Sequence, residues 1–240
     1  MEIKKKFILT IVLLSYLATA INAAIVITGL ENMAKDLDLN QSVLSWVQNS
    51  YVLAWGCFML LGGRLSDAFG RRSILNLSLL LFGIGSLFAG IATSATILIL
   101  SRFIQGVGAS ILAPTSLALI MDYFTGEERI KAIAWYSSIS GLGMCIGLVM
   151  GGTLASFLSW RYGFFIYLPL IVFMLIVSMK VLNKNNKKHS KGYFDIYGTI
   201  ASVIGIFSFV YAINGASNIW LWLIVSCISL FLFMRIESKA

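Results

Sequence analysis

The sequence predicts an all-α fold, a polytopic bundle of helices that crosses a lipid bilayer. Of the 240 residues, 59% are hydrophobic and only 12% are charged, whereas soluble domains are roughly 45–50% apolar and about 25% charged. The apolar residues form runs of about 20, the length that a helix needs to cross a hydrocarbon core. These runs are too long for the strands of a membrane barrel, and lipid offers no partner to unpaired backbone groups. Transmembrane helices are therefore expected.

Apolar runs bounded by charged residues or by Gly, Asn and Ser clusters predict eight spans, of which the last is the shortest. The first also has features of a cleaved signal peptide, because three lysines precede it and Ala18-Thr19-Ala20 has the form of a cleavage site. The apolar run continues beyond that site, which favours a retained span. The predicted spans are Phe7–Leu30, Val43–Gly62, Ile74–Thr93, Ile97–Met121, Ala132–Leu158, Gly163–Leu182, Ile196–Gly215 and Ile219–Met234.

The net charge of +8 is explained by membrane topology, so no nucleic-acid partner is predicted. Lys and Arg favour short cytoplasmic loops. If the N-terminus lies inside, all but three of the 18 Lys and Arg residues fall in cytoplasmic segments; the exceptions are Lys35, Arg161 and Arg102. An even number of spans then places both termini in the cytoplasm, in a protein of the cell (inner or plasma) membrane.

The longest break between spans runs from Asn183 to Tyr193 and contains Asn, Lys, His and Ser without apolar periodicity. This composition predicts a solvated cytoplasmic linker. We therefore expect residues 1–182 to form a six-span bundle, residues 183–194 a linker, and residues 195–240 two further spans and a short cytoplasmic tail. His189 lies in the linker with no other type of metal ligand clustered near it, so no metal site is predicted.

The segment Gly63–Ser73, between the second and third predicted spans, combines spaced glycines, an acid and several bases. Its glycines permit a tight helix-to-helix turn. Asp67 can lie against a helix N-terminus, and Arg71 or Arg72 can reach an acid on a neighbouring helix, for which Asp122 is the candidate. An ordinary positive-inside loop would explain the arginines but neither the glycines nor the aspartate. The candidate gating residues are Gly63, Arg64, Asp67, Gly70, Arg71, Arg72 and Asp122.

Gly63–Ser73 resembles the signature loop of the major facilitator superfamily, a family of secondary transporters. A second resemblance to this family lies in Leu100–Ala109 and Ile111–Ser116, which are similar to its fourth-span motif. The first match departs from the family at Ala68, where the family usually has a base, so one contact of the gate is expected to be missing.

Arg102, within the fourth predicted span, is expected to face a cavity or a polar partner, because an arginine inside a span costs a few kcal/mol on insertion scales. The alternative is a side chain that extends to the outer interface. Arg102, Gly106 and Ala109 fall on one helical face, so the charge lies beside a strip of small residues suited to close helix packing.

The fifth predicted span contains Gly143–Gly152, which resembles the antiporter motif of proton-coupled exporters. Gly143, Gly147 and Gly151 line one face and would permit close approach of another helix, and packing alone explains such a strip. Exporters have a proline where this chain has Leu148. The kink is therefore absent, and the transport direction associated with the motif is not implied.

Ser159–Pro169 resembles the aromatic turn of the 14-span drug:proton antiporters, and Phe194–Gly198 opens the pair of spans that this branch inserts. The chain corresponds to the first eight spans of that branch, and its first six are expected to form two three-helix inverted repeats. The first span departs from the branch, because Asn22 replaces an acid and Glu31 replaces a proline. Since Asn22 cannot carry a proton, any proton coupling is expected to depend on Glu31 or on a second half.

The resemblance implies a transporter, or the N-terminal part of one, of the multidrug-efflux type, with a second half or a homodimer to complete it. The alternatives are a truncated, inactive fragment and a membrane-embedded interaction or regulatory subunit. No enzyme and no cofactor are predicted, because no nucleophile with a nearby base and no phosphate-binding Gly loop is recognisable.

Polar and aromatic side chains on the inner face of the bundle could bind a small amphipathic or cationic substrate by stacking and cation–π contacts. Interhelical hydrogen bonding explains the same side chains equally well. The candidate cavity residues are Asn22, Gln48, Tyr51, Trp55, Arg102 and Gln105.

Overall fold

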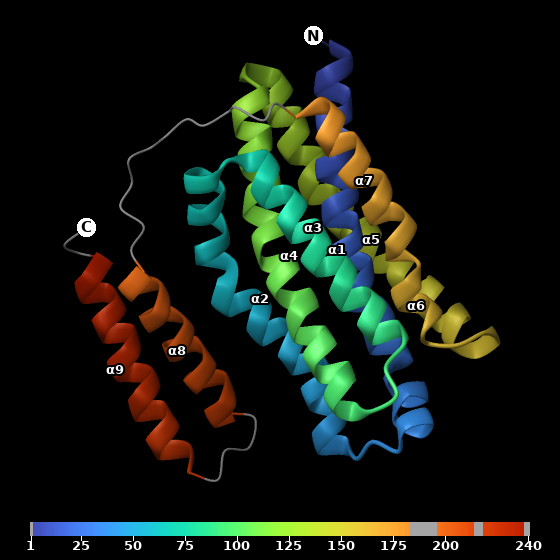
Figure 1. The fold of residues 1–240 in the computed structure, drawn as a ribbon, viewed down its shortest axis with the longest axis vertical. Helices are drawn as coiled ribbons and strands as arrows, with labels where there is room; N and C mark the ends of the chain where they lie inside the picture. The colour runs from blue at the N-terminus through green and yellow to red at the C-terminus, as the bar shows by residue number, and fades with distance from the viewer. Residues whose placement is uncertain (1, 183–195, 214–217, 238–240) are drawn as a thin grey trace.

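The structure is a computed structural model that describes residues 2–182, 196–213 and 218–237, and within these ranges it consists of helices and short turns (Figure 1). This confirms the predicted all-α fold. The helices are α1 (Glu2–Leu37), α2 (Gln41–Phe69), α3 (Arg71–Gly90), α4 (Ala95–Tyr123), α5 (Gly126–Phe157), α6 (Tyr162–Phe165), α7 (Tyr167–Val181), α8 (Ile196–Ile213) and α9 (Ile219–Glu237).

Seven helical segments in the described part of the chain are long and apolar enough to cross a membrane, judged by length and composition. They include Ile219–Ile236, which corresponds to the shortest predicted span. The apolar stretch of α8, Ile200–Ile213, is shorter than this length. The predicted linker at 183–194, with His189, and the last residues of the span predicted at 196–215 lie outside the described residues.

Several helices are longer than the apolar runs that predicted them. α2 continues to Phe69 and α3 begins at Arg71, so the expectation of a loop across Gly63–Ser73 was wrong: only Gly70 separates the two helices. Gly70 has a φ of 92°, a conformation that is open to glycine and strained for other residues. One residue of this kind is enough to reverse the chain between two helices.

The sixth predicted span, Gly163–Leu182, is divided into α6 and α7, which meet at Ile166. Pro169 lies in the first turn of α7. A proline is tolerated there because the backbone N–H groups of the first turn have no partner within their own helix. Together α6 and α7 still provide one apolar segment, Tyr162–Val181, of membrane-spanning length.

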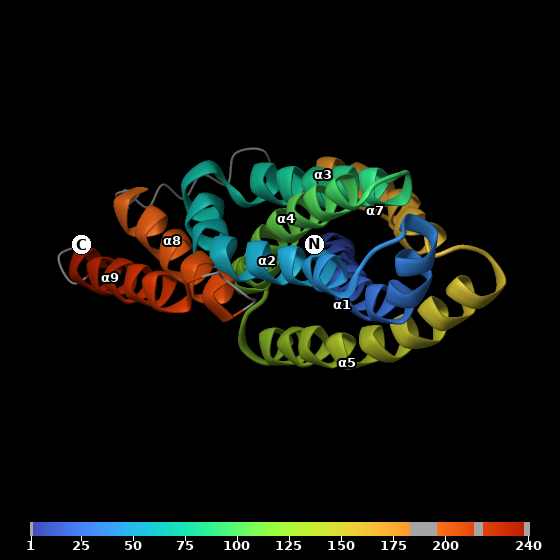
Figure 2. The same cartoon turned by 90° about the horizontal axis from the view of Figure 1, so that it is seen from below.

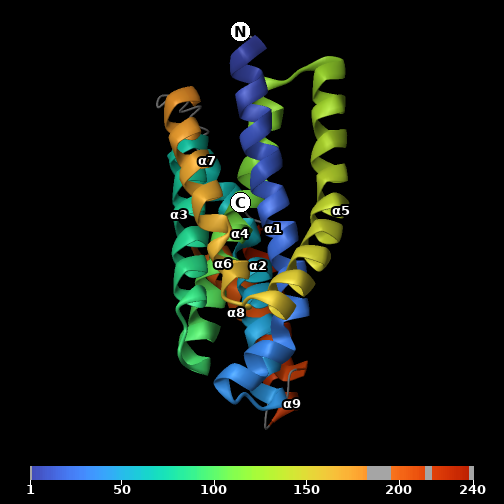
Figure 3. The ribbon, with the colours of Figure 1, turned by 90° about the vertical axis from the view of Figure 1, so that its right-hand side faces the viewer.

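α4 occupies the centre of the bundle and packs against α2 on one side and α3 on another. Viewed along the bundle, α3 and α7 line one side and α5 the other, with α1, α2 and α4 between them (Figure 2). α5 packs mainly on α1, as the side view shows (Figure 3). α8 and α9 form a hairpin against α2, where the rings of Trp46 and Tyr211 lie 6.0 Å apart.

The N-terminal end of α1, the α2–α3 turn, the α4–α5 turn and the last turn of α7 lie at the same end of the bundle (Figures 1 and 3). We call this the basic end, after Lys4, Lys5, Arg71, Arg72 and Arg129. The α1–α2, α3–α4 and α5–α6 turns lie at the opposite end. The two candidate sites predicted from the sequence lie at the basic end and in the middle of the bundle.

Candidate functional site

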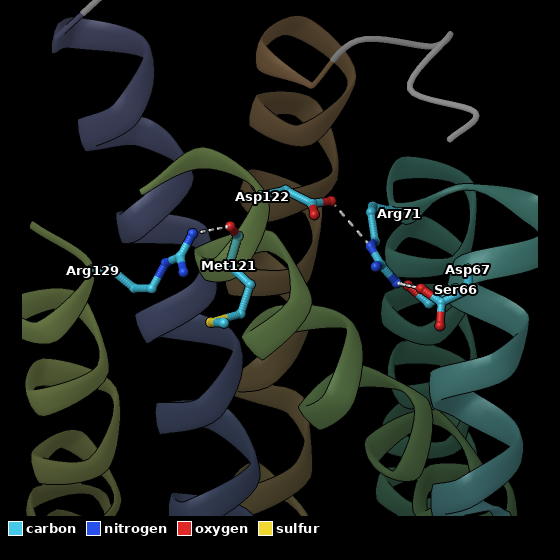
Figure 4. A network of polar contacts seen from close by, with 6 residues as sticks. All are labelled: Ser66, Asp67, Arg71, Met121, Asp122 and Arg129. Atoms are coloured by element: carbon cyan, nitrogen blue, oxygen red, sulfur yellow. Dashed lines mark hydrogen bonds and ion pairs between the residues drawn. The ribbon is translucent and has the colours of Figure 1, made fainter. Parts of the chain in front are cut away.

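At the basic end, Arg71 joins the α2–α3 connection to α4 (Figure 4). Its Nη1 lies 2.5 Å from Asp67 Oδ1 and donates to Ser66 Oγ at 3.1 Å, both on the last turns of α2. Its Nε donates to Asp122 Oδ2 at 3.2 Å, on α4. The contact between Arg71 and Asp122 predicted from the sequence is therefore present. Its role as a gate stays a prediction.

The other candidate gating residues surround this contact. Arg72 donates from Nη1 to the backbone oxygen of Leu182 at 3.1 Å and so caps the C-terminus of α7. Arg64 is half-buried on α2. Gly63 faces Pro114, and a Cβ added at Gly63 would lie 3.9 Å from Pro114 Cβ, an ordinary contact. Gly63 is therefore not required by the packing around it.

Arg129 lies at the same end, outside the sequence motif that predicted the gating residues. Its Nε donates to Phe124 O at 2.8 Å. Its Nη2 donates to Met121 O at 2.9 Å (Figure 4). These carbonyls belong to the C-terminal end of α4, where a cation is favourable. A base shortly after a predicted helix end is the sequence signal that could have indicated this cap.

In the middle of the bundle, Arg102 forms the centre of a buried polar cluster. The residue is 1% exposed. Its Nη1 donates to Gln105 Oε1 at 2.5 Å and to Asn22 Oδ1 at 3.2 Å, and its Nε donates to Val47 O at 3.3 Å. Since these partners come from α1, α2 and α4, one guanidinium links three helices. The side chain points inward and does not extend to the interface.

Aromatic rings and a further hydrogen bond complete this cluster. The Arg102 guanidinium carbon lies 4.3 Å from the Tyr51 ring centroid and 6.0 Å from that of Phe164, within the range of cation–π attraction. Gln105 Nε2 donates to Ser86 Oγ on α3 at 2.8 Å. Ser86 and Phe164 were not predicted, because their contribution depends on how α3 and α6 pack against α4.

The structure brings together four of the six predicted cavity residues, namely Asn22, Tyr51, Arg102 and Gln105. Gln48 is half-buried, and its Oε1 has no hydrogen-bond partner. Trp55 is 37% exposed on α2, one helical turn beyond Tyr51. Whether Gln48 and Trp55 line a path for substrate stays a prediction.

The glycine strip of α5 packs directly on α1. A Cβ added at Gly143 would lie 2.7 Å from Ala20 Cβ, and one added at Gly147 would lie 2.7 Å from Ala24 Cβ. At Gly151 it would collide with Thr28 Oγ1. These approaches are too close for any side chain, so the packing explanation accounts for all three glycines of the strip.

Gly106 performs the same function between α4 and α2. A Cβ added there would lie 2.5 Å from Tyr51 O and 2.8 Å from Ala54 Cβ. This close approach brings the backbone of α2 to the backbone of α4 one turn after Arg102. It thereby places Val47 O and the Tyr51 ring where they contact the guanidinium.

At the opposite end, Asp36 contacts Trp160 and Arg161, a group of residues that was not predicted as a site from the sequence. Trp160 Nε1 donates to Asp36 Oδ2 at 3.1 Å, and Arg161 forms an ion pair with the same oxygen. Asp36 lies after the apolar run of α1. The hydrogen bond that Arg161 donates to its carboxyl is the main reason why the pKa of Asp36 is below its ordinary value. These contacts join α1 to the α5–α6 turn.

Beside this contact is a shallow cleft of about 390 Å³. It is lined by Asn32, Lys35, Asp36, Ala155, Leu158, Ser159 and Trp160. Next to the cleft, and after the apolar run that ends at Leu30, Glu31 pairs with Lys35 at 2.7 Å. The hydrogen bond from Lys35 lowers the pKa of the Glu31 carboxyl. Within the described part of the chain, no group of three or more His, Cys, Asp or Glu side chains could hold a metal ion.

Comparison with known proteins extends these observations. Residues 12–236 match the family model described as Major Facilitator Superfamily. The chain is 35% identical over 213 residues to the puromycin resistance protein pur8 of Streptomyces alboniger, covering 88% of this chain and 42% of that protein. It is 30% identical over 243 residues to multidrug resistance protein 3 of Bacillus subtilis, covering 98% of this chain and 47% of that protein. The chain thus spans less than half the length of these two relatives.

Among solved structures, the chain is similar to the proton:xylose symporter XylE, with a TM-score of 0.68 and 16% identity, over 97% of this chain and 52% of that one. At this identity the similarity shows the fold alone. The family match covers nearly all of the chain, and the resemblance found in the sequence motifs is confirmed. The chain belongs to the Major Facilitator Superfamily, as a multi-pass membrane protein related to drug-resistance transporters.

Proposed function

We propose that this chain builds one half of a small-molecule transporter. The observation that carries the proposal is that nearly all of this chain aligns with less than half of a multidrug resistance protein; the match to a solved fold has similar proportions. In this family two six-helix halves rock about a central site and are related by an axis along the membrane normal. A second bundle of the same kind, or a second copy of this chain placed by that axis, would complete the path.

In this proposal residues 1–182 are the six-span half, residues 183–194 the linker and residues 195–240 two additional spans at its edge. The basic end faces the cytoplasm of a cell membrane, and both termini lie on that side. Support comes from the bias of Lys and Arg toward this end, because such residues favour cytoplasmic loops.

The compounds moved are drug-like and amphipathic. Relatives support this class by their names, which include puromycin resistance, multidrug resistance and, in Amycolatopsis lactamdurans, cephamycin export. The interior of the bundle offers aromatic rings beside polar groups at Tyr51 and Arg102, a combination suited to such compounds.

Two parts of the molecule have different roles in this mechanism. The Arg71 contacts to Asp67 and Asp122 tie α2 to α4 at the cytoplasmic end and act as part of the gate. The Arg102 cluster fixes α1, α2 and α4 around the central path. The first contact is partly exposed and can open, whereas the second is buried and maintains the shape of the half as it rocks.

The proposal is tested by transport in cells whose own exporters have been deleted. Such cells expressing this chain should retain less of a set of fluorescent amphiphiles, which includes an anion, a neutral compound and a cation, and an uncoupler should abolish the difference. The mass of the purified protein in detergent should exceed that of a single 26.4 kDa chain. The same retention with and without the chain for all compounds, together with the mass of one chain, would contradict the proposal.

A further inference from the structure

Arg102 is a buried cation whose partners are all neutral. Asn22 and Gln105 contribute amide oxygens, Val47 contributes a backbone carbonyl, and Tyr51 contributes the face of its ring. In the helices that the structure describes, the acidic residues lie in the first or last turns or just beyond the apolar runs, and Arg102 takes part in no ion pair among these residues. The interior of this half therefore has a positive charge that no carboxylate balances.

Such a charge acts over a distance inside a membrane protein. Coulomb interactions weaken as the dielectric constant rises, and a protein interior within lipid has a far lower value than water. Arg102 is only 1% exposed, so it acts on a compound at the inner face mainly through its field. That field attracts an anionic group and repels a cation.

Asn22 provides a second observation that points to the same ligand. The residue is 0% exposed, and its Oδ1 accepts from Arg102. Its Nδ2, a donor, is buried and faces the Tyr51 hydroxyl, but it forms no hydrogen bond of ordinary geometry. A buried unpaired donor is costly, and here it is next to a cation. A negatively charged group at the inner face of the bundle would be favoured by both, through the field of the guanidinium and the positive end of the amide dipole.

We propose that the Asn22–Arg102 pair makes this half selective for amphipathic organic anions, such as carboxylates, over cations of the same shape. The inference rests on the proposed transport function and specifies its substrate class. It differs from the preference for cations that the aromatic residues alone suggested. The neutral side chain at position 22 is the determinant, because an aspartate there would neutralise Arg102.

The test is direct binding of two matched fluorescent probes to the purified chain in phosphatidylcholine nanodiscs, with empty nanodiscs as blank. One probe is dansylaminoundecanoic acid, and the other has the same dansyl chain ended by a trimethylammonium group. We expect the carboxylate probe to bind about tenfold more tightly, a difference of about 1.4 kcal/mol.

Variants then test whether the preference for the carboxylate probe depends on the Asn22–Arg102 pair. Asn22→Asp should abolish this preference by weakening the binding of the carboxylate probe about tenfold, because the new carboxylate balances the charge of the guanidinium. Asn32→Asp is the matched control, the same change further along α1 where the amide donates to Ala155 O at 2.6 Å, and should keep the preference. Arg102→Lys should also keep it, because the charge is retained. If Asn22→Asp does not fold, Arg102→Gln replaces it and should abolish the preference.

The possible outcomes distinguish the proposed anion selectivity from the proposed transport function on which it rests. Equal binding of the two probes, tighter binding of the ammonium probe, or a preference that survives Asn22→Asp would overturn the selectivity alone. Binding of neither probe would overturn both the selectivity and the proposal that this half contains a substrate site.

Discussion

At the residue scale, the contact between Arg71 and Asp122 is the part of the proposed gate with the clearest measurable consequence. Asp122→Asn should lower the free energy of unfolding by only about 0.5–1 kcal/mol, because Asp122 is partly exposed and Arg71 keeps Asp67. Transport should fall by more than this loss explains if the contact is part of the gate. Thermal melting and substrate retention measure the two effects.

The control for this variant is Glu127→Gln, which removes a more exposed carboxylate at 3.9 Å from Lys131. It should change neither stability nor retention. If Asp122→Asn behaved like Glu127→Gln in both measurements, the contact would have no role in gating.

Glu31 is the second residue with a specific prediction. Its carboxylate is exposed and paired with Lys35, which lowers its pKa, so it stays ionised well below neutral pH. Stability from this pair is present above the unfolded pKa of about 4.3 and is lost as the pH falls through the lower folded value. Of the two sources of proton coupling expected from the sequence, Glu31 and a second half, this ionisation favours the second. Glu31→Gln should therefore leave any pH dependence of transport between pH 5.5 and 8 unchanged. A shifted pH profile in retention assays would instead assign proton coupling to Glu31.

Much of the residue-level site could be predicted from the sequence, for identifiable reasons. Polar partners for Arg102 were one of two expectations, because it lies within a span, and Asp122 was the candidate acid for Arg71. Ser86 and Phe164 could not be predicted, since they reach the cluster only through the packing of α3 and α6. Tyr51 and Trp55 are one turn apart on α2, and the sequence does not indicate which of them contacts Arg102.

At the scale of elements, the α1–α5 contact depends on glycines. In Gly147→Ala the new Cβ would lie 2.7 Å from both Ala24 Cβ and Ile21 O. Overpacking of this kind costs about 1–3 kcal/mol, so the melting temperature in detergent should fall by several degrees. The matched control is Gly152→Ala on the same helix, where an added Cβ meets nothing within 4 Å. Equal melting of the two variants would refute the packing assignment of the strip.

The helices themselves were predictable because apolar runs of span length allow few alternatives in lipid. Their ends were less so. α2 continues through residues that were predicted to be a loop, because a single positive φ at Gly70 reverses the chain. The break between α6 and α7 at Ile166 could have been inferred from Pro169, which favours the first turn of a helix over its interior.

At the scale of the whole molecule, the helices from α1 to α7 place the basic turns at one end of the bundle and the Arg102 cluster between the two ends (Figure 1). The α8–α9 hairpin packs against α2, at the edge of this bundle (Figure 2). This arrangement matches about half of a solved structure, and it determines which turns could form the proposed gate.

The most direct test is the labelling of single cysteines in sealed inverted and right-side-out vesicles, after replacement of Cys57, Cys145 and Cys227. Ala68→Cys lies at the basic end near the α2–α3 turn, and Ser159→Cys lies in the α5–α6 turn. We predict that an impermeant maleimide labels Ala68→Cys only from the cytoplasmic side and Ser159→Cys only from the outer side. Labelling of both positions from the same side would contradict it.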